Sequence, residues 1–222
     1  MYFVRFLKVF SLFLTLSVLV SCVDRKSSLS SLTIVCLGDS ITFGYKLADP
    51  VHQSFPGQIA KQAQGSWKVL NCGVNGATVL NKGDIPIFSQ KAYDRAIKAK
   101  SDVVILMLGT NDTKYQNFQY RDEFVDDYIK LVKTLQSLPS HPHVIACTIP
   151  PIFENYPNGL TTEREQEINK LIRKAVTASE VDFLDIYTEL SKNRAYFIDG
   201  VHPNASGAKA IATLVYDKII TL

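Results

Sequence analysis

The sequence predicts one α/β domain in which helices cover both faces of a mostly parallel, five-stranded sheet. Short apolar runs alternate with longer amphipathic stretches from residue 32 onward, as in repeated strand and helix units. The runs are nearly continuous in hydrophobicity, as expected for strands buried on both faces. With 222 residues, 46% hydrophobic and 20% charged, the chain is long enough for one domain with a full core. The expected strands are residues 32–37, 67–72, 102–108, 143–149 and 181–186.

Three of the remaining segments carry patterns that predict helices. In residues 121–138 and 204–220, apolar side chains recur at spacings of three and four. Thr162 followed by Glu165 forms a capping-box pattern, in which a hydroxyl and a carboxylate accept hydrogen bonds from free backbone N–H groups. That pattern predicts a helix that begins there and ends at about Ser179.

The first residues have the layout of an export signal. Arg5 and Lys8 precede an uncharged apolar run over residues 9–20, which is too short for a comfortable membrane span. The letters LVSC at residues 19–22 resemble a bacterial lipobox, whose cysteine is lipidated and becomes the mature N-terminus. We therefore expect an exported protein, anchored through a lipid on Cys22 to a bacterial membrane and facing the periplasm or cell surface. An ordinary cleaved signal peptide is the alternative.

These features divide the chain into a signal peptide (1–21), a polar tether (22–31) and a folded domain (32–222). Removing the signal peptide takes away two basic residues and no acid, which lowers the formal charge from +3 to +1. A net charge this small gives no reason to expect a nucleic-acid partner.

The other three cysteines, Cys36, Cys72 and Cys147, each lie inside an apolar run. Buried free thiols are the expectation at such positions, although an oxidising compartment permits one internal disulfide. No cysteine and histidine cluster has metal-ligand spacing, so we expect neither a metal nor another cofactor.

Polar, turn-like strings follow four of the five predicted strands. They read GDSIT, GVNGAT and GTND after the first three strands, and FIDGVHPNASG shortly after the fifth. A single string of this kind is an ordinary turn. Ligands of parallel α/β sheets bind beyond the carboxyl ends of the strands, however, and all four strings fall at that edge. The sequence therefore predicts a functional site there.

Ser40, in the first string, is a candidate nucleophile and would need a base, because a serine hydroxyl alone is weakly nucleophilic. His141 and His143 precede the fourth strand and so belong to the opposite edge of the sheet. His52 follows the first strand, but Asp49 beside it belongs to the same loose loop and gives it no well-placed orienting carboxylate.

His202 is the preferred base. Asp199 precedes it by three residues on a short loop, just before the last predicted helix. That spacing lets the carboxylate accept the Nδ1–H and leaves Nε2 facing Ser40.

Two further residues are candidates for stabilising an oxyanion. Gly76 has no side chain, so its backbone N–H can approach a reacting carbonyl, and Asn111 offers a side-chain amide. Each also has a purely structural interpretation, as a turn glycine and as a capping or turn asparagine.

Taken together, the four blocks resemble those of the SGNH (GDSL-type) hydrolases: GDSIT with Ser40, NGAT with Gly76, GTND with Asn111, and DGVHPN with Asp199 and His202. The resemblance covers the whole predicted domain. It implies a three-layer α/β/α sandwich of flavodoxin-like kind and a carboxylic ester hydrolase without a cofactor. It also implies roles: Ser40 as nucleophile, His202 as base, Asp199 as its orienting partner, and Gly76 with Asn111 as the oxyanion hole.

Two stretches, KGDIPIF and GTNDTKYQNF, resemble the subgroup that includes sialate and other carbohydrate O-acetylesterases. The expected substrate is thus a short acyl ester, above all acetate, on a small molecule or a glycan such as sialic acid or xylan. Several aromatic side chains in the loops after the third and fourth strands either stack on sugar rings or pack those loops. They are Tyr115, Phe118, Tyr120, Phe153 and Tyr156.

Two other functions remain open from the sequence. A lysophospholipase or thioesterase would need a long apolar trough, and no continuous apolar loop suggests one. A non-catalytic sugar-binding lipoprotein on the same fold would not need to keep a nucleophile, a base and oxyanion donors together.

Overall fold

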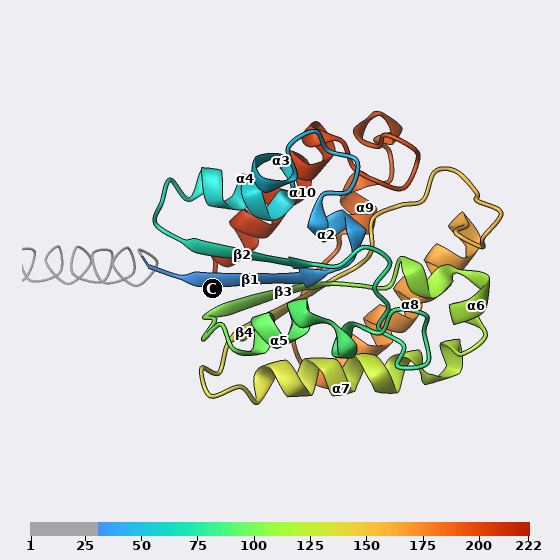
Figure 1. Cartoon of the computed structure of the whole chain (residues 1–222), viewed down its shortest axis with the longest axis horizontal. Helices are drawn as coiled ribbons and strands as arrows, with labels where there is room; N and C mark the ends of the chain where they lie inside the picture. The colour runs from blue at the N-terminus through green and yellow to red at the C-terminus, as the bar shows by residue number, and fades with distance from the viewer. Residues whose placement is uncertain (1–30) are drawn as a thin grey trace, which may run out of the picture.

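Five parallel strands form the centre of the computed structural model, which describes residues 31–222 (Figure 1). Their order is β2-β1-β3-β4-β5, and all four neighbouring pairs run parallel. The predicted α/β class and the five-stranded parallel sheet are therefore confirmed. The strands are β1 (Thr33–Gly38), β2 (Lys68–Gly73), β3 (Val103–Met107), β4 (His143–Cys147) and β5 (Asp182–Leu184).

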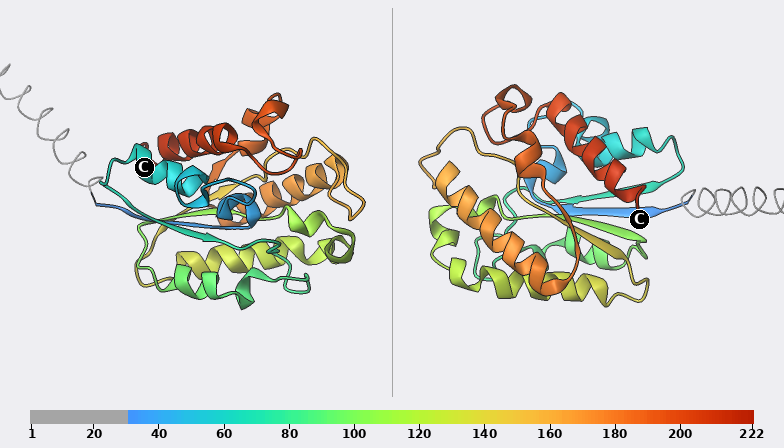
Figure 2. Two further views of the ribbon diagram at one scale, coloured as in Figure 1. Left: turned by 45° about the horizontal axis from the view of Figure 1, so that its top comes forward. Right: turned by 180° about the vertical axis from the view of Figure 1, so that it is seen from behind.

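Two layers of helices enclose the sheet (Figure 2). Side chains of β1 alternate between them: Ile34 and Cys36 pack against one layer, Val35 and Leu37 against the other. The first layer contains α2 (Ser40–Phe43), α3 (Pro50–Gln53), α4 (Phe55–Gln62), α9 (Ile186–Leu190) and α10 (Ala205–Ile219). The second contains α5 (Lys91–Ile97), α7 (Phe124–Gln136) and α8 (Thr162–Ser179).

Short helical turns occupy the connections between these elements. They are η1 (Ile87–Ser89), η2 (Asn111–Thr113), α6 (Tyr115–Phe118), η3 (Arg121–Glu123) and η4 (Arg194–Tyr196).

The expectation that all five strands are buried on both faces is wrong for the two edge strands. Most residues of β2 and all of β5 are only partly buried, because each strand has a neighbour on one side alone. Outward-facing backbone of β2 is nevertheless occupied: Arg95 donates to the Asn71 carbonyl (2.7 Å), and the Gly73 N–H donates to the Asn71 side chain (2.9 Å). These bonds protect the edge from pairing with another strand.

The predicted capping box of α8 is misplaced by one residue. Thr161 has the extended backbone of a capping residue and accepts the Arg164 N–H at 3.3 Å, whereas Thr162 is already helical. Glu165 does not reach back to the cap, because it is buried and bonded to Asn169 in the next turn. Burial raises the pKa of Glu165 to about 8.

The three cysteines inside the apolar runs, Cys36, Cys72 and Cys147, are free and buried, as expected. The predicted signal peptide, Cys22 and all but the last residue of the tether lie outside the described residues. From residue 31 to 222, none of the helices combines the length and hydrophobicity that a membrane span requires.

The strand order fixes where a site can form. The chain leaves β1 into the layer of α2 and α4, but leaves β3 toward the layer of α7. Because β1 and β3 are neighbours, their departing loops separate at the carboxyl edge and leave a crevice between them.

Candidate active site

Ser40 lies at the carboxyl end of β1, where the strand turns at once into α2. Asp39 caps that helix by accepting the Ile41 N–H at 2.9 Å. The turn is too tight for a side chain at Gly38, since a Cβ there would lie 2.0 Å from Thr42 Oγ1. The GDSIT block thus presents the Ser40 hydroxyl at the rim of the sheet.

The structure brings Ser40, His202 and Asp199 together. Ser40 Oγ lies 3.1 Å from His202 Nε2, and His202 Nδ1 lies 2.8 Å from Asp199 Oδ2. The other oxygen of Asp199 accepts the backbone N–H groups of Val201 (3.0 Å) and His202 (2.8 Å). The carboxylate therefore fixes both the ring and the loop that carries it. This is the arrangement in which imidazole removes the proton of a serine hydroxyl.

The loop after β4 supports the loop that carries the base. The Phe153 N–H donates to the Gly200 carbonyl at 2.8 Å, and the Tyr156 hydroxyl donates to the Asp199 carbonyl. The rings of Phe153 and Phe197 pack at 5.1 Å between centroids. Two of the aromatic residues considered as sugar platforms therefore hold the catalytic loop in place.

Lys46 was not predicted and contacts the Asp199 carboxylate directly. Its ammonium lies 2.6 Å from Oδ2, the same oxygen that faces the His202 ring. The preceding residue, Tyr45, packs edge-on against that ring at 4.9 Å. Burial alone would raise the pKa of Asp199, but the bonds from the His202 N–H, Lys46 and the imidazole hold it well below its usual range. These contacts thus favour the anionic form of Asp199.

The two candidate oxyanion donors face the same pocket as Ser40. Gly76 has φ +82°, a backbone conformation that favours glycine, and Asn111 begins η2 after β3. One N–H of the Asn111 amide donates to the Ala77 carbonyl at 3.1 Å, which leaves the second for a substrate oxygen.

Buried polar side chains hold these two donors in register. Asp112 accepts the N–H groups of Val79 (3.2 Å) and Leu80 (2.9 Å), joining the GTND block to the segment that follows Gly76. Burial raises the pKa of Asp112 to about 7 against the effect of these bonds. The Asn117 amide donates to the Asn111 carbonyl at 2.8 Å.

A pocket of about 440 Å³ opens over the catalytic serine. Its walls contain Tyr45, Lys114 and Asn158, which the sequence did not single out, although Tyr45 and Lys114 closely follow recognised blocks. His202 and Lys114 are the two lining residues with basic side chains, and no carboxylate lines the pocket. The full lining is Ser40, Tyr45, Asn75, Gly76, Thr110, Asn111, Lys114, Asn158, Leu160, Val201 and His202.

The remaining aromatic candidates pack against cations of the protein. The Arg164 guanidinium lies over the rings of Tyr115 (4.1 Å) and Phe118 (4.7 Å), and Lys82 lies over Tyr120 (5.7 Å). None of the three lines the pocket over Ser40. The packing interpretation of these residues is therefore favoured over sugar stacking.

The expectation that His52 lacks a well-placed orienting carboxylate is wrong. Asp49 does orient it, with Nδ1 2.7 Å from Oδ2, so it has the same Asp-x-x-His geometry as His202. Both residues are exposed, and His52 lines a different hollow of about 990 Å³ along the outer edge of β2. His52 does not contact Ser40, and the hollow, although larger, contains no paired nucleophile and base. Within residues 31–222, no group of three or more His, Cys, Asp or Glu side chains is arranged to hold a metal ion.

A parallel α/β sandwich with a Ser-His-Asp triad and two convergent donors at its carboxyl edge defines a serine hydrolase. The model of the GDSL-like lipase/acylhydrolase family matches residues 36–210. The chain belongs to this family.

Individual relatives agree with this assignment. An acetylxylan esterase from Xylanibacter ruminicola is 29% identical over 203 residues, covering 83% of this chain and 42% of that protein. The chain spans less than half the length of the curated relatives it matches. Two solved structures share the fold: a carbohydrate acetylesterase from Sinorhizobium meliloti (22% identity, TM-score 0.70) and an aryl esterase from M. smegmatis (20% identity, TM-score 0.71). Each structural match covers 86% of this chain and 99% of the matched chain.

Replacing either member of the nucleophile–base pair should remove nearly all activity. Ser40→Ala and His202→Ala should each lower kcat by roughly 10⁴–10⁶, and the double variant should be little worse, since the two act as a unit. Asn111→Ala should cost roughly 10²–10³, as the loss of one oxyanion donor does. Kinetics on p-nitrophenyl acetate measure this, with His52→Ala as the matched control. Losses that multiply in the double variant would show that the two residues do not cooperate.

Lys46→Met should move the acid limb of kcat/KM to higher pH by roughly half a unit to one unit, because the protonated ring loses a nearby cation. Lys46→Arg keeps the charge and should keep the wild-type profile. Rates measured from pH 5 to 9 give the result. A limb that stays in place in Lys46→Met while kcat falls would mean that Lys46 only holds the loop.

Proposed function

We propose that the protein is a serine esterase that removes short acyl groups, acetyl above all, from carbohydrates. The observation that carries the proposal is the paired Ser40 and His202 in the lining of a pocket that also holds the two candidate oxyanion donors. Leu160 and Val201 are the aliphatic residues of its wall, enough to contact an acetyl methyl group but too few to form a continuous apolar channel. The relatives named as acetylxylan esterase and carbohydrate acetylesterase support the same substrate class.

The geometry supports a two-step acyl transfer. Ser40 Oγ attacks the acetyl carbonyl carbon and passes its proton to His202 Nε2, while the carbonyl oxygen becomes an oxyanion facing Gly76 and Asn111. The oxyanion collapses, the sugar oxygen leaves with the proton from His202, and the acetyl group stays on Ser40. A water molecule, deprotonated by His202, repeats the sequence and releases acetate. Asp199 keeps the imidazole in the required orientation throughout.

A lipid ester is the main alternative, as substrate of a lysophospholipase or thioesterase. It would need a continuous apolar channel leading to Ser40. A larger and more apolar hollow runs along β2, and its lining does not include Ser40. A non-catalytic sugar-binding protein is disfavoured by the intact pairing of nucleophile, base and carboxylate.

Acyl-chain length separates these alternatives. We expect kcat/KM on p-nitrophenyl esters to fall from acetate to octanoate, because only two aliphatic side chains, Leu160 and Val201, line the pocket and added methylenes gain little apolar contact. A matching apolar channel would instead add about 0.8 kcal/mol per buried methylene, roughly fourfold each. A preference of tenfold or more for octanoyl over acetyl esters would replace the acetylesterase with the lipid esterase. The rates of acetate release from acetylated xylan and O-acetylated sialic acid then show which of these substrates the enzyme prefers.

We further propose that the enzyme is exported and anchored to a bacterial membrane through a lipid on Cys22. The support is the sequence alone: a basic start, an apolar run and the LVSC pattern at residues 19–22. Several acyl chains on one N-terminus would give stable attachment, whereas a single chain gives only marginal binding.

Expression in a bacterial host should yield a membrane-bound form that incorporates labelled fatty acid, and Cys22→Ser should lose both the label and the attachment. Ser21→Ala, which keeps the cysteine, serves as the control. Label that persists in Cys22→Ser would leave an ordinary signal peptide as the explanation of this segment.

A further inference from the structure

We propose that the catalytic pocket selects acetylated sugars that carry a carboxylate, and that the Lys114 ammonium binds this carboxylate. The inference rests on the proposed acetylesterase function and specifies its substrate. The shared chemistry is that of an acidic sugar, either a sialic acid or a uronic acid.

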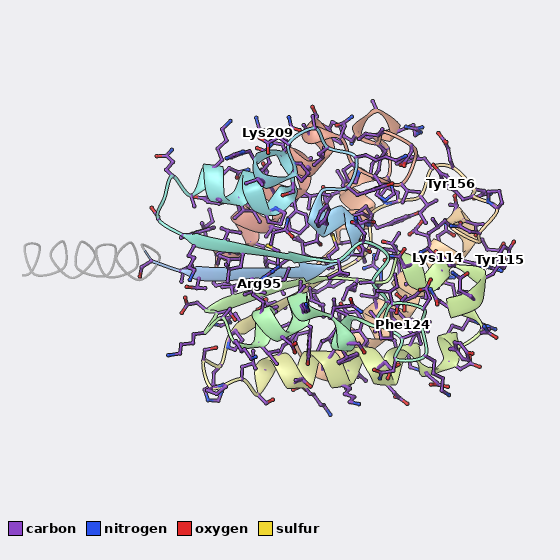
Figure 3. All side chains as sticks on the ribbon, viewed as in Figure 1. Arg95, Lys114, Tyr115, Phe124, Tyr156 and Lys209 are labelled. Atoms are coloured by element: carbon purple, nitrogen blue, oxygen red, sulfur yellow. The ribbon has the colours of Figure 1, made fainter. Side chains whose placement is uncertain are left out.

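The position of Lys114 is the first observation. It lines the pocket together with Ser40 and His202, and Figure 3 places it beyond the carboxyl ends of the strands, at the start of α6. Its Nζ lies 4.0 Å from where a Cβ on Gly76 would stand. The ammonium is therefore beside the oxyanion donor, within reach of a substituent on the sugar ring that carries the ester.

The charge of the pocket is the second observation. Lys46, Lys82 and Lys218 each have a carboxylate oxygen 2.6 Å away. By contrast, none of the ion pairs within residues 31–222 includes Lys114, and no Asp or Glu lines the pocket. A substrate that displaces water from this ammonium without supplying an anion leaves the charge poorly compensated. Asp39 and Asp84 lie near enough to interact electrostatically with the Lys114 ammonium, but neither forms an ion pair with it and neither lines the pocket. A substrate carboxylate would be the direct ion-pair partner of this ammonium, which makes the pocket complementary to an acidic sugar.

Hydrogen bonds hold the backbone of Lys114 in place, so its side chain starts from a well-defined position. Its N–H donates to the Asn111 carbonyl at 3.2 Å, and its own carbonyl accepts the Phe118 N–H at 2.8 Å. Arg164 donates to the neighbouring Thr113 carbonyl at 3.3 Å. The same short segment therefore carries an oxyanion donor and the proposed carboxylate-binding group, and its backbone bonds fix the spacing between Asn111 and the Cα of Lys114.

An ammonium at this place has one other possible role, direct stabilisation of the oxyanion. The two roles make different predictions. Every acetyl ester forms the same oxyanion, so an oxyanion role would affect acidic and neutral sugars equally. Recognition of a carboxylate affects acidic sugars alone and acts mainly on KM, because the contact exists before the reaction starts.

The test compares acidic and neutral acetylated sugars on one set of variants. The substrates are O-acetylated sialic acid, an acetylated methyl glucuronoside and, as the neutral partner, an acetylated methyl glucoside. In the wild type, kcat/KM should be higher on the acidic sugars, and this preference should shrink as salt is added. Comparing the sialic acid with the glucuronoside shows which acidic sugar the pocket accepts.

Lys114→Met should lower the ratio of acidic to neutral kcat/KM by tenfold or more, mainly through KM, whereas Lys114→Arg should retain most of it. Lys209→Met is the matched control, since Lys209 is an exposed lysine on α10, away from the pocket (Figure 3), and should keep the wild-type ratio. Binding of free sialic acid and glucuronic acid to Ser40→Ala, with and without Lys114→Met, gives a readout that does not depend on turnover.

Equal losses on acidic and neutral sugars in Lys114→Met would assign the ammonium to the oxyanion and overturn the proposal. A wild type that prefers the neutral glucoside would overturn it as well, while leaving the acetylesterase function intact. If no acetylated sugar released acetate, the proposed function itself would fail.

Discussion

The carboxylate of Asp199 joins the segments on which the site depends. One oxygen accepts two backbone N–H groups of its own loop, and the other faces both the His202 ring and the Lys46 ammonium. Lys46 belongs to the loop that leaves α2, so the carboxylate links the segment of the nucleophile to the segment of the base. A charge in this position must be well compensated to be favourable, and here each oxygen has two donors.

Around this carboxylate, residues outside the pocket lining hold the site in place. The loop after β4 supports the Asp199 loop through Phe153 and Tyr156, while Asp112 and Asn117 hold the two oxyanion segments together. These contacts join the strand ends in two pairs, β4 with β5 and β2 with β3. The site therefore depends on the spacing of the strands, and the sheet supplies the rigidity that pre-organised donors need.

Much of this could be predicted from the sequence, because alternating apolar runs dictate a parallel sheet and the blocks at their ends dictate a site. The features that could not be predicted depend on where individual side chains point. Lys46 has φ +68°, a left-handed backbone conformation that the sequence pattern did not predict. From this position its long side chain reaches Asp199. Spacing alone also failed to separate the two Asp-x-x-His motifs, since Asp49 orients His52 just as Asp199 orients His202. They differ in position: His202 contacts Ser40, whereas His52 lies exposed beside the outer edge of β2.

The distance between Ser40 and His202 along the chain, 162 residues, has a consequence for folding. The nucleophile is near the start of the domain and the base near its end, so their contact closes a loop that contains four strands and most of the helices. Contacts of such long range form late, after the entropy of ordering the intervening chain has been overcome. A chain whose final segment has not docked therefore lacks the Ser40–His202 pair, even when most of the sheet is assembled. Recovery of turnover during refolding would therefore report the docking of the final segment. Spectroscopic probes of secondary structure report helix and strand content and are less sensitive to this docking step.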